Sequence, residues 1–201
     1  TTVPGLYAAG DMASVPHNYM LGAFTNGMFA GEDAVDYIAE CDFAEIDEGQ
    51  VEAEMTRVLA PTKREDGIPP NQIEYKTRRL VNDYLQPPKV TRKMLLAQDR
   101  FAEVREDLNQ MVATDSHELM RSLEAQSILD CADMAAHASM FRTESRWGLY
   151  HAYADYPEKN NVDWFCHAQL KKDDNGKMTS FKRKVAPYIV EIDDEEEARL
   201  K

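Results

Sequence analysis

Two long stretches of helical periodicity constrain the fold of this chain more than any other feature of its sequence. The first runs from about Thr91 to Val112, and its apolar residues recur mostly three and four positions apart, as on one face of an α-helix. Thr114-Asp115-Ser116 then interrupts the pattern and supplies side-chain oxygens that can cap a new helix. The second stretch begins at Glu118 or Leu119 and runs to about Arg142.

The apolar faces of these segments predict how they pack. The face of the first long helix consists of Met94, Leu95, Phe101, Val104, Leu108 and Met111. The face of the second consists of Leu119, Leu123, Ile128, Leu129, Ala132, Ala135 and Ala136. The alanines allow neighbouring helices to approach closely. A third amphipathic helix is expected over residues 71–85, ended by Pro87-Pro88, and a bundle of about three antiparallel helices would bury all three faces.

The residues that follow the bundle predict a small β region. Residues 164–170 and 177–185 alternate between apolar and polar side chains as strands do. Asp174-Asn175-Gly176 lies between them and favours a hairpin, because Asn and Gly both tolerate positive φ. Residues 186–192 are a candidate for one more strand, and the five consecutive carboxylates of Asp193–Glu197 predict a solvated end.

The start of the chain has a different character. Residues 3–11, Val-Pro-Gly-Leu-Tyr-Ala-Ala-Gly-Asp, predict a short buried strand that ends in a glycine turn and an acidic residue. Residues 21–41 are rich in small side chains and predict a helix. A strand, a Gly-Asp turn and a helix form a place where a nucleotide cofactor can lie. Since one strand cannot form a sheet, we expect that the chain has lost its beginning.

Composition limits the partners and the compartment. The formal net charge of −13 disfavours nucleic acid and anionic membranes as partners, because both require a basic surface. No stretch is long and apolar enough to span a bilayer, and the N-terminus has no secretory pattern, so any membrane association would go through a partner. The three cysteines, Cys41, Cys131 and Cys166, are far apart, which favours free thiols in a reducing cytoplasm over disulfides or a metal site.

Gly10 and Asp11 are the first candidates for a cofactor site. A glycine at the end of a strand lets a cofactor approach the backbone, and the carboxylate can accept hydrogen bonds from sugar or ribityl hydroxyls. The whole string over residues 3–11 resembles the second FAD-contacting motif of the fumarate reductase and succinate dehydrogenase flavoprotein family. The resemblance implies that Gly10 and Asp11 contact FAD.

The loop that follows narrows the branch of this family. In the succinate and fumarate enzymes, the matching loop has an arginine that grips a substrate carboxylate, and here that position is Met20. The spacing of His17, Gly22, Gly27 and Gly31 is more similar to the α subunit of adenylylsulfate reductase. The resemblance implies that His17 lies beside the flavin, as a proton donor or an anion contact. The alternative is a loop histidine with a structural hydrogen bond.

The helix after this loop is the second candidate for cofactor contact. In the resembled family, its N-terminus points at the pyrimidine edge of the flavin, where unpaired N–H groups and the helix dipole stabilise negative charge in the reduced state. Gly22 and Ala23 lie at the expected entry to the helix. Thr25 and Asn26 are the best candidates for the contact itself, through the backbone more than the side chain.

A second string, Arg142-Thr143-Glu144-Ser145-Arg146, continues through His151 to Asp155-Tyr156-Pro157, with Trp164 beyond. It resembles the Arg-x-Glu-Ser-Arg, histidine, Asp-Tyr-Pro pattern of the same family, and its spacing is again similar to the adenylylsulfate reductase branch. The resemblance implies that Arg146, a candidate catalytic residue, and His151 shape an active-site edge or a domain interface. The alternative is a structural ion pair of Glu144 with Arg146 or Arg142.

These expectations combine into one hypothesis and one rival. The chain is identified as the C-terminal part of a flavoprotein subunit: residues 1–45 are the end of an FAD-binding Rossmann-like domain, residues 46–145 are helical, and residues 146–201 are a hairpin extension with an acidic tail. The complete protein would pass electrons between a small anionic substrate and FAD, with an iron–sulfur partner. Because no Gly-x-Gly-x-x-Gly loop is present, we expect these residues alone to be inactive. The rival is a non-catalytic helical interaction module.

Overall fold

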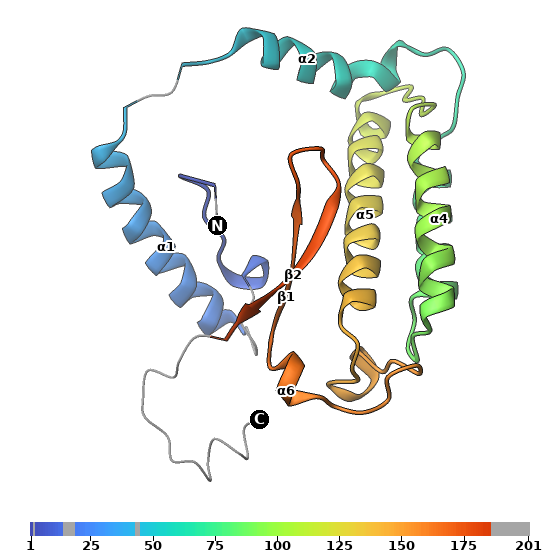
Figure 1. Cartoon of the computed structure of the whole chain (residues 1–201). Coiled ribbons are helices and arrows are strands. Elements are labelled where there is room, and N and C mark those ends of the chain that lie inside the picture. The colour runs from blue at the N-terminus through green and yellow to red at the C-terminus, as the bar shows by residue number, and fades with distance from the viewer. Residues whose placement is uncertain (2, 14–18, 43–44, 186–201) are drawn as a thin grey trace. The chain divides into compact units, whose positions relative to one another are not determined.

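The computed structural model describes residues 1, 3–13, 19–42 and 45–185 (Figure 1). The chain forms two compact units, Thr1–Val51 and Glu52–Lys201. The helix α2 (Glu48–Leu59) spans the limit between them. The domain boundaries expected near residues 45 and 145 stay predictions.

The first unit contains a short 3₁₀ turn, η1 (Gly10–Met12), and the helix α1 (Met20–Glu40), which begins and ends within one residue of the expected limits. The strand expected before η1 does not form, which corrects the sequence prediction. The N–H of Leu6 instead donates to the carbonyl of Val3 at 3.1 Å in a turn. Among the described residues of this unit there is no other strand to supply the ladder of hydrogen bonds that a strand requires.

The second unit is built on a three-helix bundle, as the sequence predicts. Its helices are α3 (Pro70–Tyr84), α4 (Thr91–Leu108) and α5 (Ser116–Phe141), and each packs against the other two. Figure 1 shows α4 and α5 side by side. Four of the large side chains in the core, Ile73, Met94, Phe101 and Leu129, are at most 1% exposed. Burying one such side chain stabilises the fold by about 1.5–3 kcal/mol, so this core holds the bundle together.

The start of α5 follows the capping signal of the sequence. The Asp115 carboxylate accepts a hydrogen bond from the N–H of Glu118 at 2.8 Å. The Glu118 carboxylate accepts in return from the N–H and the hydroxyl of Thr114, at 2.8 and 2.7 Å. These two hydrogen bonds hold the pKa of Glu118 below its usual range. Reciprocal capping therefore fixes the start of the helix.

The buried face of α5 differs in part from the one expected. The residues that are buried are Ser122, Ala125, Leu129, Ala132, Ala136 and Ser139. Ala135, which was expected on this face, is exposed, because the stripe through Leu129, Ala132 and Ala136 leaves it on the neighbouring side of the helix. Ser122 is tolerated in the core because its hydroxyl donates to the carbonyl of Glu118 at 3.0 Å.

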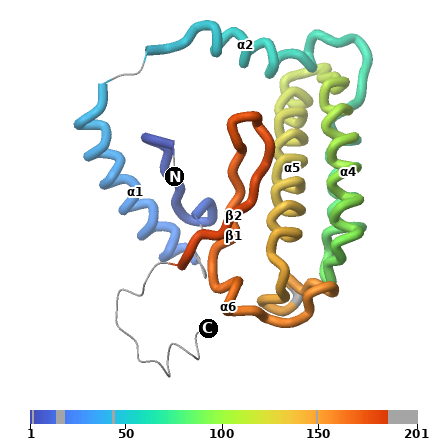
Figure 2. The backbone as a smooth tube through the Cα atoms, viewed as in Figure 1, coloured from blue at the N-terminus to red at the C-terminus, as the bar shows by residue number. Residues whose placement is uncertain are grey.

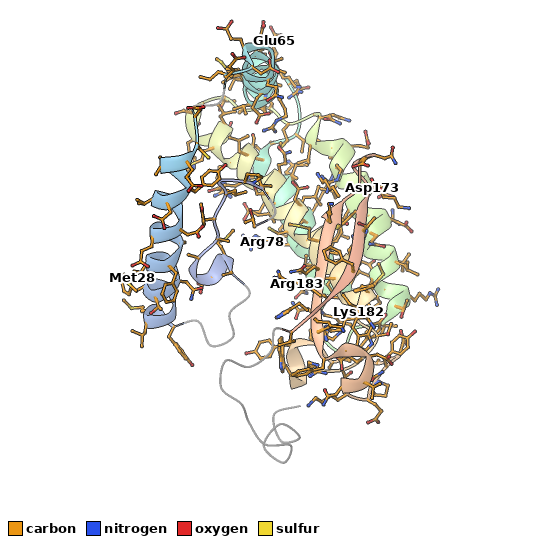
Figure 3. All side chains as sticks on the ribbon, turned by 60° about the vertical axis from the view of Figure 1, so that its left-hand side comes forward. Met28, Glu65, Arg78, Asp173, Lys182 and Arg183 are labelled. Carbon is orange, nitrogen blue, oxygen red and sulfur yellow. The ribbon has the colours of Figure 1, made fainter. Side chains whose placement is uncertain are left out.

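The hairpin follows a short helix, α6 (Asn161–Trp164). Its strands, β1 (Cys166–Lys172) and β2 (Met178–Lys184), are antiparallel, with Cys166 opposite Lys184. Figure 2 shows the hairpin beside α5, which both strands contact. Asp173 lies at the turn (Figure 3), where its carboxylate accepts from the N–H groups of Asn175 and Lys177 at 3.0 and 2.8 Å.

The hairpin prediction is thus confirmed, and the candidate strand at residues 186–192 lies outside the described residues. In the part of the chain that the structure describes, no helix combines the length and the apolar character needed to cross a bilayer.

Candidate functional site

The Gly-Asp turn of the first unit has the backbone geometry that its sequence suggested. Gly10 has a φ of 63°, in the left-handed region, where a side chain costs about 1–2 kcal/mol. It is also the one buried residue among the described residues of this unit. Asp11 is exposed in the first turn of η1. A glycine is therefore required at this position, and a carboxylate accessible from solvent follows it.

A hydrogen bond that the sequence did not indicate links this segment to α1. The hydroxyl of Tyr7 donates to Asp33 Oδ2 at 2.7 Å. This hydrogen bond, assisted by desolvation and by the charge of Asp33, raises the pKa of Tyr7 to about 12. The two residues lie 26 positions apart, and no motif in the sequence connects them.

The first turn of α1 carries the backbone N–H groups that the helix itself leaves without an acceptor. The helix begins at Met20, and the N–H of Ala23 donates to the carbonyl of Tyr19 at 3.0 Å. The N–H groups of Met20, Leu21 and Gly22 therefore have no acceptor within the helix. Of the four residues predicted here, Gly22 is the one that retains such an N–H group.

Thr25 and Asn26 lie one turn further along, where the helical ladder already engages their backbone N–H groups. Their side chains donate to the carbonyls of Leu21 and Gly22, at 2.9 and 2.8 Å. The expected contact of Thr25 and Asn26 with a cofactor stays a prediction, and the backbone N–H groups that lack an acceptor within the helix lie in the turn before these two residues. His17, the predicted catalytic histidine, lies outside the described residues.

The second family string folds into a buried ionic cluster in the other unit. Glu144 is fully buried and accepts hydrogen bonds from both neighbouring arginines. Arg142 Nη1 lies 2.5 Å and Arg146 Nε lies 2.7 Å from Glu144 Oε1, and the N–H of Asn160 lies 2.9 Å from Oε2. Burial alone would raise the pKa of Glu144, but the hydrogen bonds from Arg146, Asn160 and Arg142 outweigh it and lower the pKa.

The same arginines connect α5 to the hairpin. Arg142 also donates to the carbonyls of Trp164 and Cys166, at 3.0 and 2.6 Å. Its guanidinium and the ammonium of Lys182, which lies on β2 (Figure 3), both contact the ring of Trp164. The ion pair weighed from the sequence is thus present with both arginines, and it joins three elements.

The Asp-Tyr-Pro part of the string caps a helix of the bundle. The Asp155 carboxylate accepts from the N–H and the hydroxyl of Thr91, the first residue of α4, at 2.7 and 2.6 Å. These bonds lower the pKa of Asp155. Thr91 also shares a hydrogen bond of 2.7 Å with the hydroxyl of the buried Tyr153. Sequence reasoning missed this cap, because it joins residues 64 positions apart.

An open pocket lies beside the ionic cluster. Its volume is about 270 Å³, and its lining includes Ser139, Arg142, Arg146, Trp147, Tyr150 and His151. His151 Nε2 is 3.1 Å from the carbonyl oxygen of Arg142, so this nitrogen carries a proton. Burial, followed by the charges of Lys89 and Arg142, lowers the pKa of His151. Arg146 and His151, paired in the sequence interpretation, thus line one pocket.

In the described part of the chain, no group of three or more His, Cys, Asp or Glu side chains is placed so that it could hold a metal ion.

Residues 75–197 match the sequence model of the family described as the fumarate reductase flavoprotein C-terminal family. This chain belongs to that family. Residues of this flavoprotein domain are also 36% identical, over 61 residues, to the succinate dehydrogenase flavoprotein subunit of Rickettsia conorii, a match that covers 30% of the chain and 10% of that subunit.

Two solved structures resemble this chain over nearly its whole length. Adenylylsulfate reductase from Archaeoglobus fulgidus superposes with a TM-score of 0.87 and 28% identity over 94% of this chain. A variant of E. coli quinol fumarate reductase superposes with a TM-score of 0.79 and 21% identity over 94%, which shows the common fold. This chain spans about a third of each, 33% and 35%. The expected flavoprotein family and the likeness to its adenylylsulfate reductase branch are thereby confirmed.

Proposed function

We propose that this flavoprotein domain serves an FAD-dependent oxidoreductase that passes electrons between a small anionic substrate and the flavin, with an iron–sulfur protein as the electron partner. The observation that carries the proposal is the superposition on adenylylsulfate reductase, which covers 94% of this chain at 28% identity. The −13 net charge permits a basic protein partner. We also propose a cytoplasmic location, with any membrane contact made through a partner.

The residues of the first unit fit an FAD at its sugar and flavin side. The left-handed Gly10 has no side chain that would keep a cofactor from its backbone, and the exposed Asp11 carboxylate can accept from hydroxyl groups. The first-turn N–H groups of Met20, Leu21 and Gly22 supply donors and the positive end of the helix dipole. FAD, when bound, supplies the two-electron chemistry. These residues would hold it and stabilise negative charge.

Substrate choice rests on His17 and on Met20, the first residue of α1. Met20 stands where the succinate and fumarate enzymes are expected to have an arginine, and a thioether cannot make a bidentate ionic contact with a carboxylate. We therefore propose an anion other than a dicarboxylate, with His17 as the proton donor or anion contact.

The pyrophosphate of FAD requires a glycine-rich loop that these 201 residues do not contain. We therefore propose that the chain alone binds FAD weakly and is inactive. Purification of the 201-residue chain tests this through its absorbance spectrum. A chain that retains stoichiometric flavin would refute this part of the proposal.

The role of the Gly-Asp turn is tested in the longer protein that carries this chain. Gly10→Val should remove flavin, because φ is 63° and the new side chain would occupy the cofactor's approach. Ala13→Val is the matched control, since its extended backbone (φ −96°, ψ 150°) accepts a β-branched residue. Equal flavin content in both variants would contradict the assignment.

The rival hypothesis is a non-catalytic helical interaction module. A gene whose reading frame begins at Thr1 would favour that module over the flavoprotein.

A further inference from the structure

The pocket beside the ionic cluster is large enough for a small ligand and belongs wholly to the second unit. It is bounded by the end of α5, by the segment from Arg142 to His151 and by Ala168 of β1. Its volume of about 270 Å³ equals about nine water molecules in the liquid. It is separate in sequence from the residues assigned to FAD.

The charges around the pocket do not balance. Arg142 and Arg146 share one carboxylate, that of Glu144, which is fully buried and accepts from both. Lys89 Nζ donates to Ser139 Oγ at 2.7 Å, and among the described residues no carboxylate lies within ion-pair distance of it. Burial lowers the pKa of this ammonium. Two arginines of the pocket lining, and a lysine that is one hydrogen bond away from the lining, thus have one carboxylate between them. A half-buried cation without a counter-charge is costly.

Hydrogen-bond donors remain available on the same side. Glu144 engages Arg146 through Nε and Nη2, and within the described residues Nη1 makes no hydrogen bond. Ser139 is 8% exposed and lines the pocket, and since its oxygen accepts from Lys89, its own proton can point elsewhere. Nε2 of His151 is committed to the Arg142 carbonyl, so Nδ1 of the same ring can donate only when the ring takes a second proton.

The rim of the pocket carries a strained aromatic residue. Trp147 has a φ of 58°, in the left-handed region that bulky residues seldom adopt, and it is 76% exposed. Strained backbone of this kind recurs at ligand sites, where the surrounding structure holds it in place. Here the N–H of Arg146 donates to the carbonyl of His151 at 3.1 Å and closes the loop that carries Trp147.

From the geometry and the charges we infer that this pocket binds a small oxyanion of the phosphate, sulfate or carboxylate class, held by Arg146 and Ser139 and neutralised in part by Lys89, with His151 as a further donor when its ring is protonated. Such a ligand supplies acceptor oxygens for the free donors and the missing negative charge. This site goes beyond the proposed flavin chemistry, and it does not depend on it.

The test is a titration of the 201-residue chain with inorganic phosphate at constant ionic strength, with chloride as the balancing salt. Trp147 fluorescence and the His151 ring resonances should change saturably. The charges of Lys89 and Arg142 disfavour protonation of His151, whereas the charge of Glu144 favours it. Bound phosphate adds negative charge beside that of Glu144, so it should raise the pKa of His151. Sulfate should compete. A linear response, or an equal response to chloride, would overturn the inference.

Variants separate the pocket from general electrostatics. Lys89→Met should weaken phosphate binding at least about tenfold, the loss expected for one charge-assisted interaction. Lys93→Met removes an exposed lysine from α4 and is the matched control, with affinity within about twofold of the parent. Lys89→Arg should keep most of the affinity. That result would show that Lys89→Met binds phosphate weakly because it has lost the positive charge, and not because it is unfolded. Equal affinities for the two methionine variants would contradict the site.

The chain's own carboxylates are the alternative source of an oxyanion. A variant in which all five side chains of Asp193–Glu197 are amides distinguishes the sources. Similar phosphate affinity in the parent and in this variant supports a free ligand. If phosphate binds only to the amide variant, the chain's own carboxylates occupy the pocket in the parent. That result would overturn the inference of a separate ligand.

Discussion

Helices α1 and α4 differ sharply in what they bury. In α4, Met94, Ala97, Phe101 and Val104 form one stripe that the bundle covers completely. In α1 no described residue is buried, and its large apolar side chains are exposed, Phe24 at 70%. Sequence composition predicts both helices, but burial depends on what packs against them. The bundle supplies its own core, whereas α1 presents apolar side chains that the described residues leave exposed.

The first prediction uses the same substitution in both helices. Phe101→Ala should lower the free energy of unfolding by about 3–5 kcal/mol, because the side chain is 1% exposed in the core. Phe24→Ala should change it by less than about 0.5 kcal/mol, because the ring is exposed on α1. Denaturant unfolding followed by circular dichroism measures both. A comparable loss from Phe24→Ala would show that α1 is packed as tightly as the bundle.

The second prediction concerns the buried ionic cluster of the bundle unit. Glu144→Gln should destabilise by about 3 kcal/mol, because it leaves Arg142 and Arg146 without their shared counter-charge. Glu103→Gln is the control, since its pair with Arg100 is exposed and is worth less than about 1 kcal/mol. Equal losses of stability in the two variants would show that the buried cluster stabilises the fold no more than an exposed ion pair does.

The pH dependence of the same variant follows from the lowered pKa of Glu144. A carboxyl whose pKa is lower in the folded than in the unfolded state stabilises fully above its unfolded pKa, about 4.3. That contribution is lost as the pH falls through the folded pKa. The stability difference between parent and Glu144→Gln should therefore be constant from neutral pH to about 5 and shrink below about 4. A difference that grows on acidification would contradict the shift.

The sequence predicted the features that depend on neighbouring residues, but it did not predict contacts between segments that are far apart in the chain. The periodicity of residues 91–142, the cap at Asp115 and the Asn-Gly turn are local, and all three appear in the structure. The first long helix, however, ends at Leu108 and not at the expected Val112. The link of Lys89 to Ser139 joins segments 50 positions apart and has no local signature. The strand expected at residues 3–9 had the right composition, but it needed a partner strand that the described residues of the first unit do not provide.

The third prediction applies one glycine substitution to each unit. At Gly67 a new Cβ would lie 2.2 Å from the carbonyl oxygen of Gln110, which also accepts the N–H of Ile68 at 2.8 Å. Gly67→Ala should therefore destabilise by about 1–3 kcal/mol, because backbone must move. At Gly27 of α1 nothing lies within 4 Å, so Gly27→Ala should stabilise the helix by up to about 1 kcal/mol. Thermal unfolding compares the two, and changes of the same sign would contradict the difference between the units.

The smallest expected effect lies in the first unit and concerns the bond between Tyr7 and Asp33. The pKa of Tyr7 is raised to about 12 chiefly because its hydroxyl donates to the Asp33 carboxylate. In Asp33→Asn that pKa should fall toward the ordinary value of about 10, because the negative acceptor is gone. Resonances of isotopically labelled tyrosine follow the titration. Asp36→Asn, which removes a carboxylate from the same helix without touching Tyr7, should leave the pKa unchanged. If Tyr7 titrates near 10 in the parent, its hydrogen bond to Asp33 does not form. The turn before Gly10 is then not joined to α1 by this contact.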